Sequence, residues 1–360
     1  MSNILIIASA ARVGGALTII KNILNEALET EYNYTVIIDP IISKQLPISK
    51  KIKYIYVNTQ SWIKRIIYDN FYYKKIINED DYSFCLNLQN VPVRFKRLKQ
   101  FVYYHQPLPL INYKFSPFKR DELKLFIYKH FYFLFVKLNK KFANKFIVQT
   151  MWVKEALAKK LDFNINYIFI IKPKINLSKI ENNLYDNKIN WLFYPAQAFS
   201  YKNHKLLIKI FEKIGKEYLE RNNFRLYLTI NDRDFPKLYQ KVQELKLDNI
   251  IFFLGNLTKD ETIFYYKQCK SLIFTSNIET YGLPLAEATY FGSYIIAGNH
   301  PFSNEILKDY PNKKICNPTS IKEWVDAVKE LPSKNKMEKD NFDIQNENND
   351  KILILLLKIK

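Results

Sequence analysis

Short apolar runs alternate with longer segments of helical apolar spacing over residues 1–175. The runs predict strands at 3–8, 34–38, 52–57, 83–88, 101–104, 146–148 and 167–171. The helical spacing predicts helices at 16–28, 62–77, 121–142 and 152–161. Strands that alternate with helices form a mostly parallel sheet that is covered by helices on both faces. This part of the chain therefore predicts one Rossmann-like α/β domain.

The same alternation returns after a polar stretch, 176–190, which we interpret as a linker. The expected strands are 191–194, 224–230, 250–254, 271–274 and 294–297. The expected helices are 203–218, 235–245, 259–269, 284–291 and 321–331. Two successive α/β series predict two Rossmann-like domains, 1–175 and 191–332, which face each other across a deep cleft. Ligands of such sheets bind beyond the carboxyl ends of the strands.

The last segment, 333–360, changes character twice. Residues 333–350 are polar and low in complexity, which is typical of a linker, whereas 351–360 (KILILLLKIK) are apolar again. This short apolar segment either packs back on a domain or touches a membrane surface, and we favour packing.

Composition excludes several classes of protein. Of the 360 residues, 48% are hydrophobic and 25% charged, which is normal for a packed globular chain and excludes wholesale disorder. Cys85, Cys269 and Cys316 are scattered and have no metal-ligand spacing, which favours a reducing compartment. The longest apolar runs, such as 131–136 and 352–357, are far shorter than the ~20 residues of a membrane helix. We therefore expect a soluble or peripheral protein.

The positive charge is concentrated in the first half of the chain. Residues 1–180 hold 29 Lys and Arg against 12 Asp and Glu, a net charge of +17, whereas residues 181–360 have a net charge of +3. Such a half indicates an anionic partner: a nucleic acid, a phosphorylated substrate or an anionic membrane surface. Basic and aromatic residues alternate over 115–146, a pattern that suits a lipid headgroup region or an ordinary surface helix. We favour the membrane surface.

The segment 276–288 (S-N-I-E-T-Y-G-L-P-L-A-E-A) holds the most specific pattern. It follows an expected strand, and Pro284 suits the first turn of a helix because its missing N–H costs nothing there. The backbone amides just before that helix then form an anion site suited to phosphate. Glu287, one turn into the helix among apolar residues, can accept two sugar hydroxyls. Taken alone, Glu279 or Glu287 equally suits a solvated carboxylate near a helix start.

This segment resembles the acidic-x7-acidic signature of glycosyltransferase family 4, whose members have the two-domain GT-B fold. The resemblance covers residues 3–331 and is stronger in the second domain. It implies that Glu287 holds the ribose of a nucleotide and that Glu279 contacts the transferred sugar. It also implies that the backbone amides of Tyr281, Gly282 and Leu283 bind the diphosphate of the nucleotide.

A second stretch, 194–203 (Y-P-A-Q-A-F-S-Y-K-N), resembles the first strand and loop of the family's donor domain. The resemblance implies that Lys202 neutralises the diphosphate. Many members have a Gly-Arg pair in this loop, whereas this chain has Ala196 and Gln197. We keep Gln197 as a donor-binding candidate and expect Lys202 to neutralise more of the phosphate charge. A single lysine is usually a solvated side chain. The position of Lys202 between an expected strand and an expected helix favours a functional role instead.

The stretch 252–256 (F-F-L-G-N) resembles the family's turn beside the nucleobase. A glycine there lets the backbone approach a flat ring closely. The resemblance makes Gly255, Asn256 and Leu257 candidates for nucleotide binding. Similar turns occur in many α/β domains, so this pattern is weak when it is taken alone.

Two features of the first domain complete the candidate site. Gly14 and Gly15 follow the first strand and resemble the family's glycine loop, which lies under the donor diphosphate and beside the acceptor. They do not form G-x-G-x-x-G, which disfavours a dehydrogenase. His105 follows the expected strand 101–104, and the family often has a histidine there, near the reacting sugar. We interpret His105 as a catalytic candidate, although a lone histidine is more often structural.

The sequence thus predicts a retaining glycosyltransferase of the hexosyltransferase type, in which Glu279, Lys202 and His105 are catalytic. It would build bacterial surface polysaccharide or lipopolysaccharide from a nucleotide-sugar on a glycan acceptor, which we expect to be lipid-linked. We expect neither a metal nor another cofactor, no nucleic-acid partner, and a cytoplasmic location on the inner face of the membrane. A sugar-nucleotide epimerase on the same fold and a basic nucleic-acid-binding protein remain alternatives.

Overall fold

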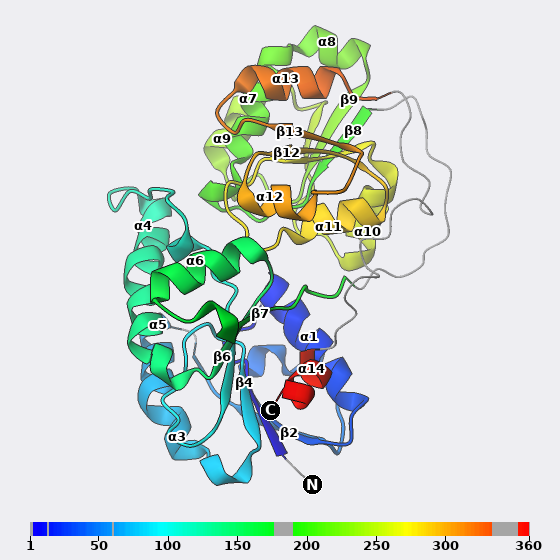
Figure 1. Cartoon of the computed structure of the whole chain (residues 1–360). Coiled ribbons are helices and arrows are strands. Elements are labelled where there is room, and N and C mark those ends of the chain that lie inside the picture. Colours follow the sequence, from blue (N-terminus) through cyan, green and yellow to red (C-terminus); the bar gives the residue numbers. More distant parts are fainter. Residues whose placement is uncertain (1–2, 13, 60, 176–189, 333–351, 360) are drawn as a thin grey trace. The chain divides into compact units, whose positions relative to one another are not determined.

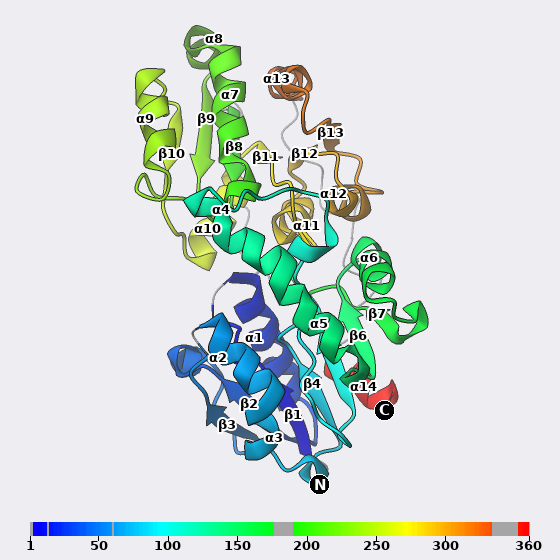
Figure 2. The ribbon, with the colours of Figure 1, turned by 90° about the vertical axis from the view of Figure 1, so that its left-hand side faces the viewer.

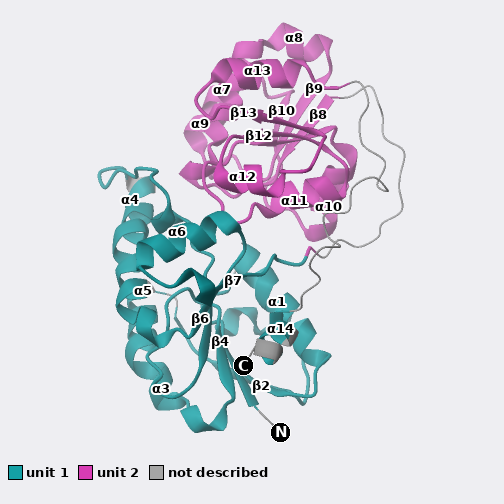
Figure 3. Cartoon of the chain, in the orientation of Figure 1, with its two compact units in different colours: residues 1–174, 348–360 teal, residues 175–347 magenta. Residues whose placement is uncertain are grey.

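The computed structural model describes residues 3–12, 14–59, 61–175, 190–332 and 352–359 (Figure 1). It divides into two compact units, which Figure 3 distinguishes by colour. Unit 1 comprises Met1–Lys174 and Asn348–Lys360, and unit 2 comprises Ile175–Glu347. All of the expected linker 176–190 except its last residue, and the polar stretch 333–350, lie outside the described residues.

Unit 1 is built on a seven-stranded parallel sheet in the order β3-β2-β1-β4-β5-β6-β7. Its strands are β1 (Asn3–Ile7), β2 (Asn33–Ile38), β3 (Ile52–Tyr56), β4 (Phe84–Asn87), β5 (Gln100–Tyr103), β6 (Lys145–Val148) and β7 (Ile168–Ile170). Every predicted strand of this half of the chain is present. The parallel arrangement confirms the α/β class that the alternation predicted.

Helices cover both faces of this sheet (Figures 1 and 2). They are α1 (Gly14–Leu28), α2 (Trp62–Ile67), α3 (Tyr73–Ile76), α4 (Arg120–Ile127), α5 (Phe133–Asn139), α6 (Met151–Leu161) and α14 (Ile352–Ile359). A π-helical turn, η2 (Tyr68–Tyr72), joins α2 to α3, and another, η5 (Tyr128–Tyr132), joins α4 to α5. The predicted helices 62–77 and 121–142 are therefore present, each with a π turn in its middle.

Strand β1 shows why helices cover both faces. Successive side chains of a strand point to opposite faces of the sheet. Ile4 and Ile6 belong to a buried cluster with residues of α1, whereas Leu5 and Ile7 belong to a second cluster with Tyr73 of α3. All four strand side chains are fully buried, so the strand reads as a continuous apolar run in the sequence.

The apolar end of the chain packs against unit 1. Leu353 and Leu356 of α14 are buried in the same cluster as residues of α1. The backbone N–H of Leu353 donates to Oε2 of Glu26 on α1 at 3.1 Å. The structure therefore confirms the favoured alternative, in which this segment packs on a domain.

Unit 2 is built on a six-stranded parallel sheet in the order β10-β9-β8-β11-β12-β13. Its strands are β8 (Asn190–Tyr194), β9 (Phe224–Leu228), β10 (Ile251–Phe253), β11 (Ser271–Phe274), β12 (Tyr294–Gly298) and β13 (Lys313–Cys316). Its helices are α7 (His204–Ile214), α8 (Lys216–Arg221), α9 (Pro236–Glu244), α10 (Lys259–Gln268), α11 (Leu283–Tyr290), α12 (Pro301–Ile306) and α13 (Ile321–Lys329).

Two features of unit 2 differ from the sequence prediction. The predicted helix 203–218 is broken at Gly215, whose φ of 87° lies in the region that side chains other than glycine rarely adopt. The chain therefore forms two helices, α7 and α8, in place of one. The prediction also missed α12 and the edge strand β13, because one is a short helix and the other begins with two lysines.

Candidate functional site

The order of strands in unit 2 reverses at β8, which lies between β9 and β11. Ligands of open parallel sheets bind outside the carboxyl ends of the strands at such a switch point. The loops that leave this point are residues 195–203, after β8, and residues 275–282, after β11. They hold both of the stretches that carry the strongest resemblance.

Hydrogen bonds fasten these two loops together. The hydroxyl of Thr275 donates to the carbonyl oxygens of Lys202 and Asn203 at 3.2 and 3.3 Å. The N–H of Asn277 donates to the carbonyl oxygen of Tyr201 at 2.9 Å. Asn203 has a left-handed backbone (φ 58°) at the start of α7, which turns the chain sharply after Lys202. The position of Lys202 is therefore set by the neighbouring loop.

Lys202 and Glu279 form an ion pair across the switch point. Their side chains are only 14% and 16% exposed, so the pair is largely shielded from water. Burial raises the pKa of the Tyr201 hydroxyl, and the negative charge of Glu279 raises it further. The structure thus brings together the two predicted catalytic residues of this unit, which lie 77 positions apart in the sequence.

Helix α11 begins beside this pair in the way the sequence suggests. Gly282 precedes the helix with φ 85°, and Pro284 occupies its first turn. No acceptor within the described part of the chain is found for the backbone amides of Tyr281, Gly282 and Leu283. Unpaired amides at a helix start attract anions, because they add to the positive end of the helix dipole.

Glu287 lies one turn into α11 and is partly buried. The hydroxyl of Tyr266 on α10 donates to its Oε2 at 2.7 Å. Burial raises the pKa of Glu287 to about 7, although the bond from Tyr266 and the charge of Lys259 act in the opposite direction. This carboxyl group therefore changes its charge near neutral pH, and its second oxygen is able to accept another hydrogen bond.

The turn after β10 is tight against the loop after β9. Gly255 has φ 73°, a backbone conformation in which any other residue is strained, and a Cβ atom there would also require the Asn231 side chain, 2.6 Å away at Oδ1, to move. Asn256 is exposed and Leu257 partly buried. In the loop after β8, the side chain of Gln197 is exposed, and no contact of it is found with other described residues.

The predicted residues of unit 1 lie at the carboxyl edge of its own sheet. Gly14 and Gly15 are the first two residues of α1. The helix therefore begins two residues before the predicted start at residue 16, because two glycines fit in a first helical turn. His105 follows β5, and its backbone N–H donates to Oδ1 of Asn90 at 2.7 Å. Burial lowers the pKa of His105 to about 4, and the positive charge of Arg65 adds to this effect.

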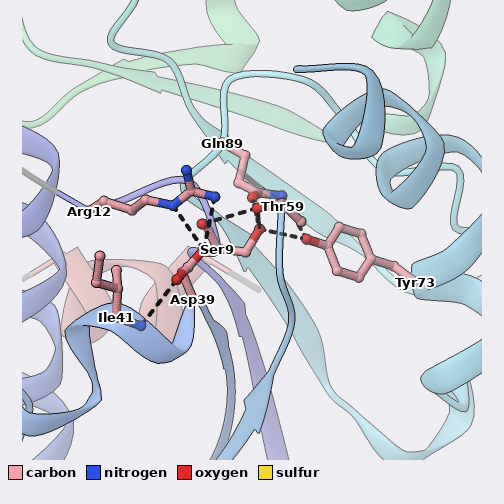
Figure 4. Close-up of polar contacts among 7 residues, drawn as sticks. All are labelled: Ser9, Arg12, Asp39, Ile41, Thr59, Tyr73 and Gln89. Atoms are coloured by element: carbon pink, nitrogen blue, oxygen red, sulfur yellow. Dashed lines mark hydrogen bonds and ion pairs between the residues drawn. The ribbon is translucent and has the colours of Figure 1, made fainter. Parts of the chain in front are cut away.

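A polar network at this edge was missed by the sequence analysis (Figure 4). Ser9, which follows β1, donates to Oε1 of Gln89 at 2.6 Å and is bonded to the hydroxyl of Tyr73 at 2.8 Å. The hydroxyl of Thr59, which follows β3, donates to Oγ of Ser9 at 3.0 Å. The network joins the loops that follow β1, β3 and β4. Single polar residues between apolar runs gave no signal for it.

Arg12 and Asp39 form a second polar contact at the same edge. Their ion pair joins the loop after β1 to the residue that follows β2, at 2.8 Å. The same carboxylate accepts the N–H of Ile41 at 3.1 Å, which caps a short 3-10 turn. Arg12 is therefore held in place by a buried carboxylate.

Neither a metal-binding cluster nor a membrane-spanning helix is present in the part of the chain that the structure describes. Among the described residues, no group of three or more His, Cys, Asp or Glu could hold a metal ion. In the same residues, no helix is both long enough and apolar enough to cross a membrane. The expectation of a reaction without metal stays a prediction.

Comparison with known proteins defines the class. Residues 177–347 match the family model described as glycosyl transferases group 1. The chain is 23% identical over 257 residues to the O-antigen chain mannosyltransferase RfbU of Salmonella typhimurium, covering 69% of each protein. Its fold is similar to a glycosyltransferase from Rickettsia africae (TM-score 0.64, 15% identity, 91% and 87% of the two chains). It is also similar to Anabaena HepE in complex with UDP and glucose (TM-score 0.63, 14% identity, 91% and 89%).

Two parallel α/β units and these similarities define a glycosyltransferase with the GT-B fold, as the sequence predicted. Within that class, the match to the glycosyl transferases group 1 lies in unit 2. The enzyme class and the fold predicted from the sequence are therefore confirmed.

Proposed function

We propose that the protein transfers a hexose from a nucleoside-diphosphate sugar to a glycan acceptor in the synthesis of a bacterial surface polysaccharide or lipopolysaccharide. The observation that carries this proposal is the arrangement at the switch point of unit 2. There a shielded lysine is paired with Glu279, and three backbone amides at the start of the helix that carries Glu287 have no acceptor among the described residues. The acceptor class is taken from the similarity to an O-antigen mannosyltransferase.

Each group has a distinct task in the proposed reaction. Lys202 and the amides of residues 281–283 hold the diphosphate, and Glu287 accepts the ribose hydroxyls. Glu279 is paired with Lys202 in the free protein. When the diphosphate binds Lys202 in its place, Glu279 contacts the hydroxyls of the sugar. In unit 1, the low pKa of His105 keeps its imidazole uncharged at neutral pH, so it can take part in a hydrogen bond with a substrate.

The anomeric configuration is retained in this proposal. The bond between the anomeric carbon and the phosphate oxygen breaks, and its electrons stay on the diphosphate. The acceptor oxygen bonds to that carbon from the same face, and its proton passes to the departing phosphate oxygen. The protein's part is electrostatic: a cation and oriented amides stabilise the charge that develops on the leaving group.

A thermal-shift panel of UDP-, GDP- and dTDP-sugars tests the donor. The sugar nucleotide that is the substrate should raise the melting temperature, because a ligand at 100 times its Kd stabilises by roughly 2.7 kcal/mol. The matched nucleoside without phosphates serves as the control and should stabilise less. A panel in which no sugar nucleotide shifts the melting temperature would contradict the proposed donor site.

We also propose that unit 1 attaches to an anionic membrane surface. Its helices α2–α3 and α4–α5 lie side by side (Figure 2), joined by a hydrogen bond between Asn139 and Asn70 at 3.1 Å. Each exposes an apolar stripe at helical spacing. The exposed residues are Ile63, Ile67, Phe71 and Ile76 on one helix, and Leu123, Phe131, Leu134 and Leu138 on the other. Exposed lysines accompany both stripes, so the surface matches a lipid headgroup region in charge and polarity.

Replacing exposed lysines of this surface should weaken binding to vesicles of phosphatidylglycerol and phosphatidylcholine. Each lysine near an anionic surface contributes about 1 kcal/mol, so K124Q, K137Q and K141Q together should lower the affinity by roughly 100-fold. Co-sedimentation at low salt measures this. Lys140 is left unchanged, because its Nζ donates to the carbonyl oxygens of Leu161 and Asp162.

The matched control replaces three exposed lysines of α7 in unit 2, Lys205, Lys209 and Lys213, with glutamine. That variant should bind vesicles like the unchanged protein. Equal losses in both variants would show that net charge alone is responsible. Failure of the unchanged protein to bind anionic vesicles would reject the membrane proposal and leave the donor site unaffected.

A further inference from the structure

Four buried polar atoms without a hydrogen-bond partner among the described residues lie near one place in unit 1. They are Nε of Arg65, Oδ2 of Asp69, the hydroxyl of Tyr104 and Nδ1 of His105. Unpaired buried polar atoms are uncommon in folded proteins, and each one needs an explanation. Four in one place indicate that a polar group is missing from the free protein.

Tyr132 connects these residues. The guanidinium of Arg65 donates to its hydroxyl at 3.1 Å, and that hydroxyl donates to the carbonyl oxygen of Gln89 at 2.7 Å. Tyr104 is close enough for Tyr132 to add to the rise of its pKa, which is caused mainly by burial. The charge of Arg65 likewise reaches His105. All four residues therefore lie around Tyr132, in the middle of the helix that runs from α4 to α5.

The backbone supports this position on both sides. Arg65 lies just before the π turn η2, and Tyr132 is the last residue of the π turn η5. π turns are rare and often occur at functional sites. Here two of them come together, and hydrogen bonds at 3.1 Å join their helices at Arg65–Tyr132 and Asn139–Asn70.

Arg65 forms no ion pair with the described residues, because none of their carboxylates lies within 4.0 Å of its nitrogen atoms. Asp69 accepts from Nε2 of Gln89 at 3.0 Å, and burial raises the pKa of Asp69 although the charge of Arg65 acts in the opposite direction. A shielded cation is costly unless an anion accompanies it.

The location is where a ligand of this unit would lie. Gln89 follows β4 and His105 follows β5, so the cluster lies at the carboxyl edge of the parallel sheet. Arg65 is also on the helix that exposes Ile63 and Ile67. Those two side chains lie on the outer face of the helix, which we propose meets the membrane, whereas Arg65 lies on the inner face with the buried cluster.

We propose that Arg65, together with His105, binds a phosphate group that joins the lipid to the glycan of the acceptor. The guanidinium supplies the charge and its planar set of N–H donors, which matches phosphate oxygens. The neutral imidazole supplies one further hydrogen bond. This proposal rests on the proposed function, because it assigns the acceptor of that reaction; it involves no residue of the donor site in unit 2.

The test measures binding of dodecyl phosphate, below its micelle concentration, by isothermal titration calorimetry. The unchanged protein should bind it, and should bind the neutral dodecyl glucoside at least tenfold more weakly. R65Q should lower the affinity for dodecyl phosphate at least tenfold, and R65K should restore part of it. The matched control K64Q removes an exposed charge next to Arg65 and should leave the affinity unchanged.

Two further measurements separate this site from the donor site and identify the source of the phosphate. K202A should bind dodecyl phosphate as the unchanged protein does, and R65Q should keep its thermal shift with the donor sugar nucleotide. Competition by glucose 1-phosphate would assign the site to a sugar phosphate in place of a lipid-linked one and overturn the lipid part of the proposal. Equal affinity of the unchanged protein for dodecyl phosphate and dodecyl glucoside would overturn all of it, even if R65Q does not fold.

Discussion

The variant K202A should transfer sugar about 10²–10³-fold more slowly than the unchanged protein, while its affinity for the nucleoside part of the donor falls much less. The loss of one electrostatic contact to a developing charge typically costs that much in rate. Lys202 is largely shielded from water, so its charge acts on the diphosphate with little screening. The neighbouring Gln197 offers no replacement cation.

Single-turnover rates and donor Kd values, measured separately, check this expectation. K205A is the matched control, because Lys205 lies three positions further on, is exposed and has no recorded partner among the described residues. It should keep the full rate. If K202A also kept the full rate, the assignment of Lys202 would be wrong. A uniform loss of affinity without a loss of rate would make it a binding residue only.

The alternation of strands and helices could be predicted from the sequence because of how parallel strands are buried. A strand such as β1, covered on both faces, reads as an uninterrupted apolar run. Where burial is one-sided or incomplete, the pattern fails. The edge strand β13 begins with the half-buried Lys313 and the exposed Lys314, so the sequence did not predict it.

The candidate site could be predicted in part for a similar reason. Lys202 and Glu279 each follow a strand, and the carboxyl ends of the neighbouring strands β8 and β11 bring them together. The cluster around Arg65 could not be found in this way. Arg65 and Tyr132 lie inside amphipathic helices, where each looks like an ordinary surface residue. Only the packing of the two helices shows that their polar atoms are buried together.

The two glutamates of unit 2 should separate binding from turnover. E287Q should weaken nucleotide binding, because a neutral amide is a poorer acceptor for ribose hydroxyls than a carboxylate. E279Q should chiefly lower the rate, since Glu279 is paired with Lys202 in the loop before α11, whereas Glu287 lies within that helix. Donor Kd values and single-turnover rates of both variants distinguish the two roles. Negligible effects of both substitutions on affinity and rate would remove the assignment.

The pH dependence of nucleotide binding gives a sharper test of Glu287. Burial raises its pKa to about 7 in the free protein, so the carboxylate form that accepts hydrogen bonds is populated only as the pH rises through 7. Affinity for the nucleotide should therefore increase over that range, and this increase should be absent in E287Q.

The stability of the free protein should change in the opposite direction, and decrease as the pH rises. A carboxyl group whose pKa is higher in the folded state than in the unfolded one stabilises the fold at low pH, and this contribution is lost as the pH rises from about 4.5 to about 7. At pH 8, the melting temperature of free E287Q should thus be no lower than that of the unchanged protein. The control E217Q replaces an exposed glutamate of α8, and both its nucleotide affinity and its melting temperature should depend on pH as in the unchanged protein. An affinity that does not depend on pH between 6 and 8 in the unchanged protein would show that Glu287 does not meet the nucleotide as a carboxylate.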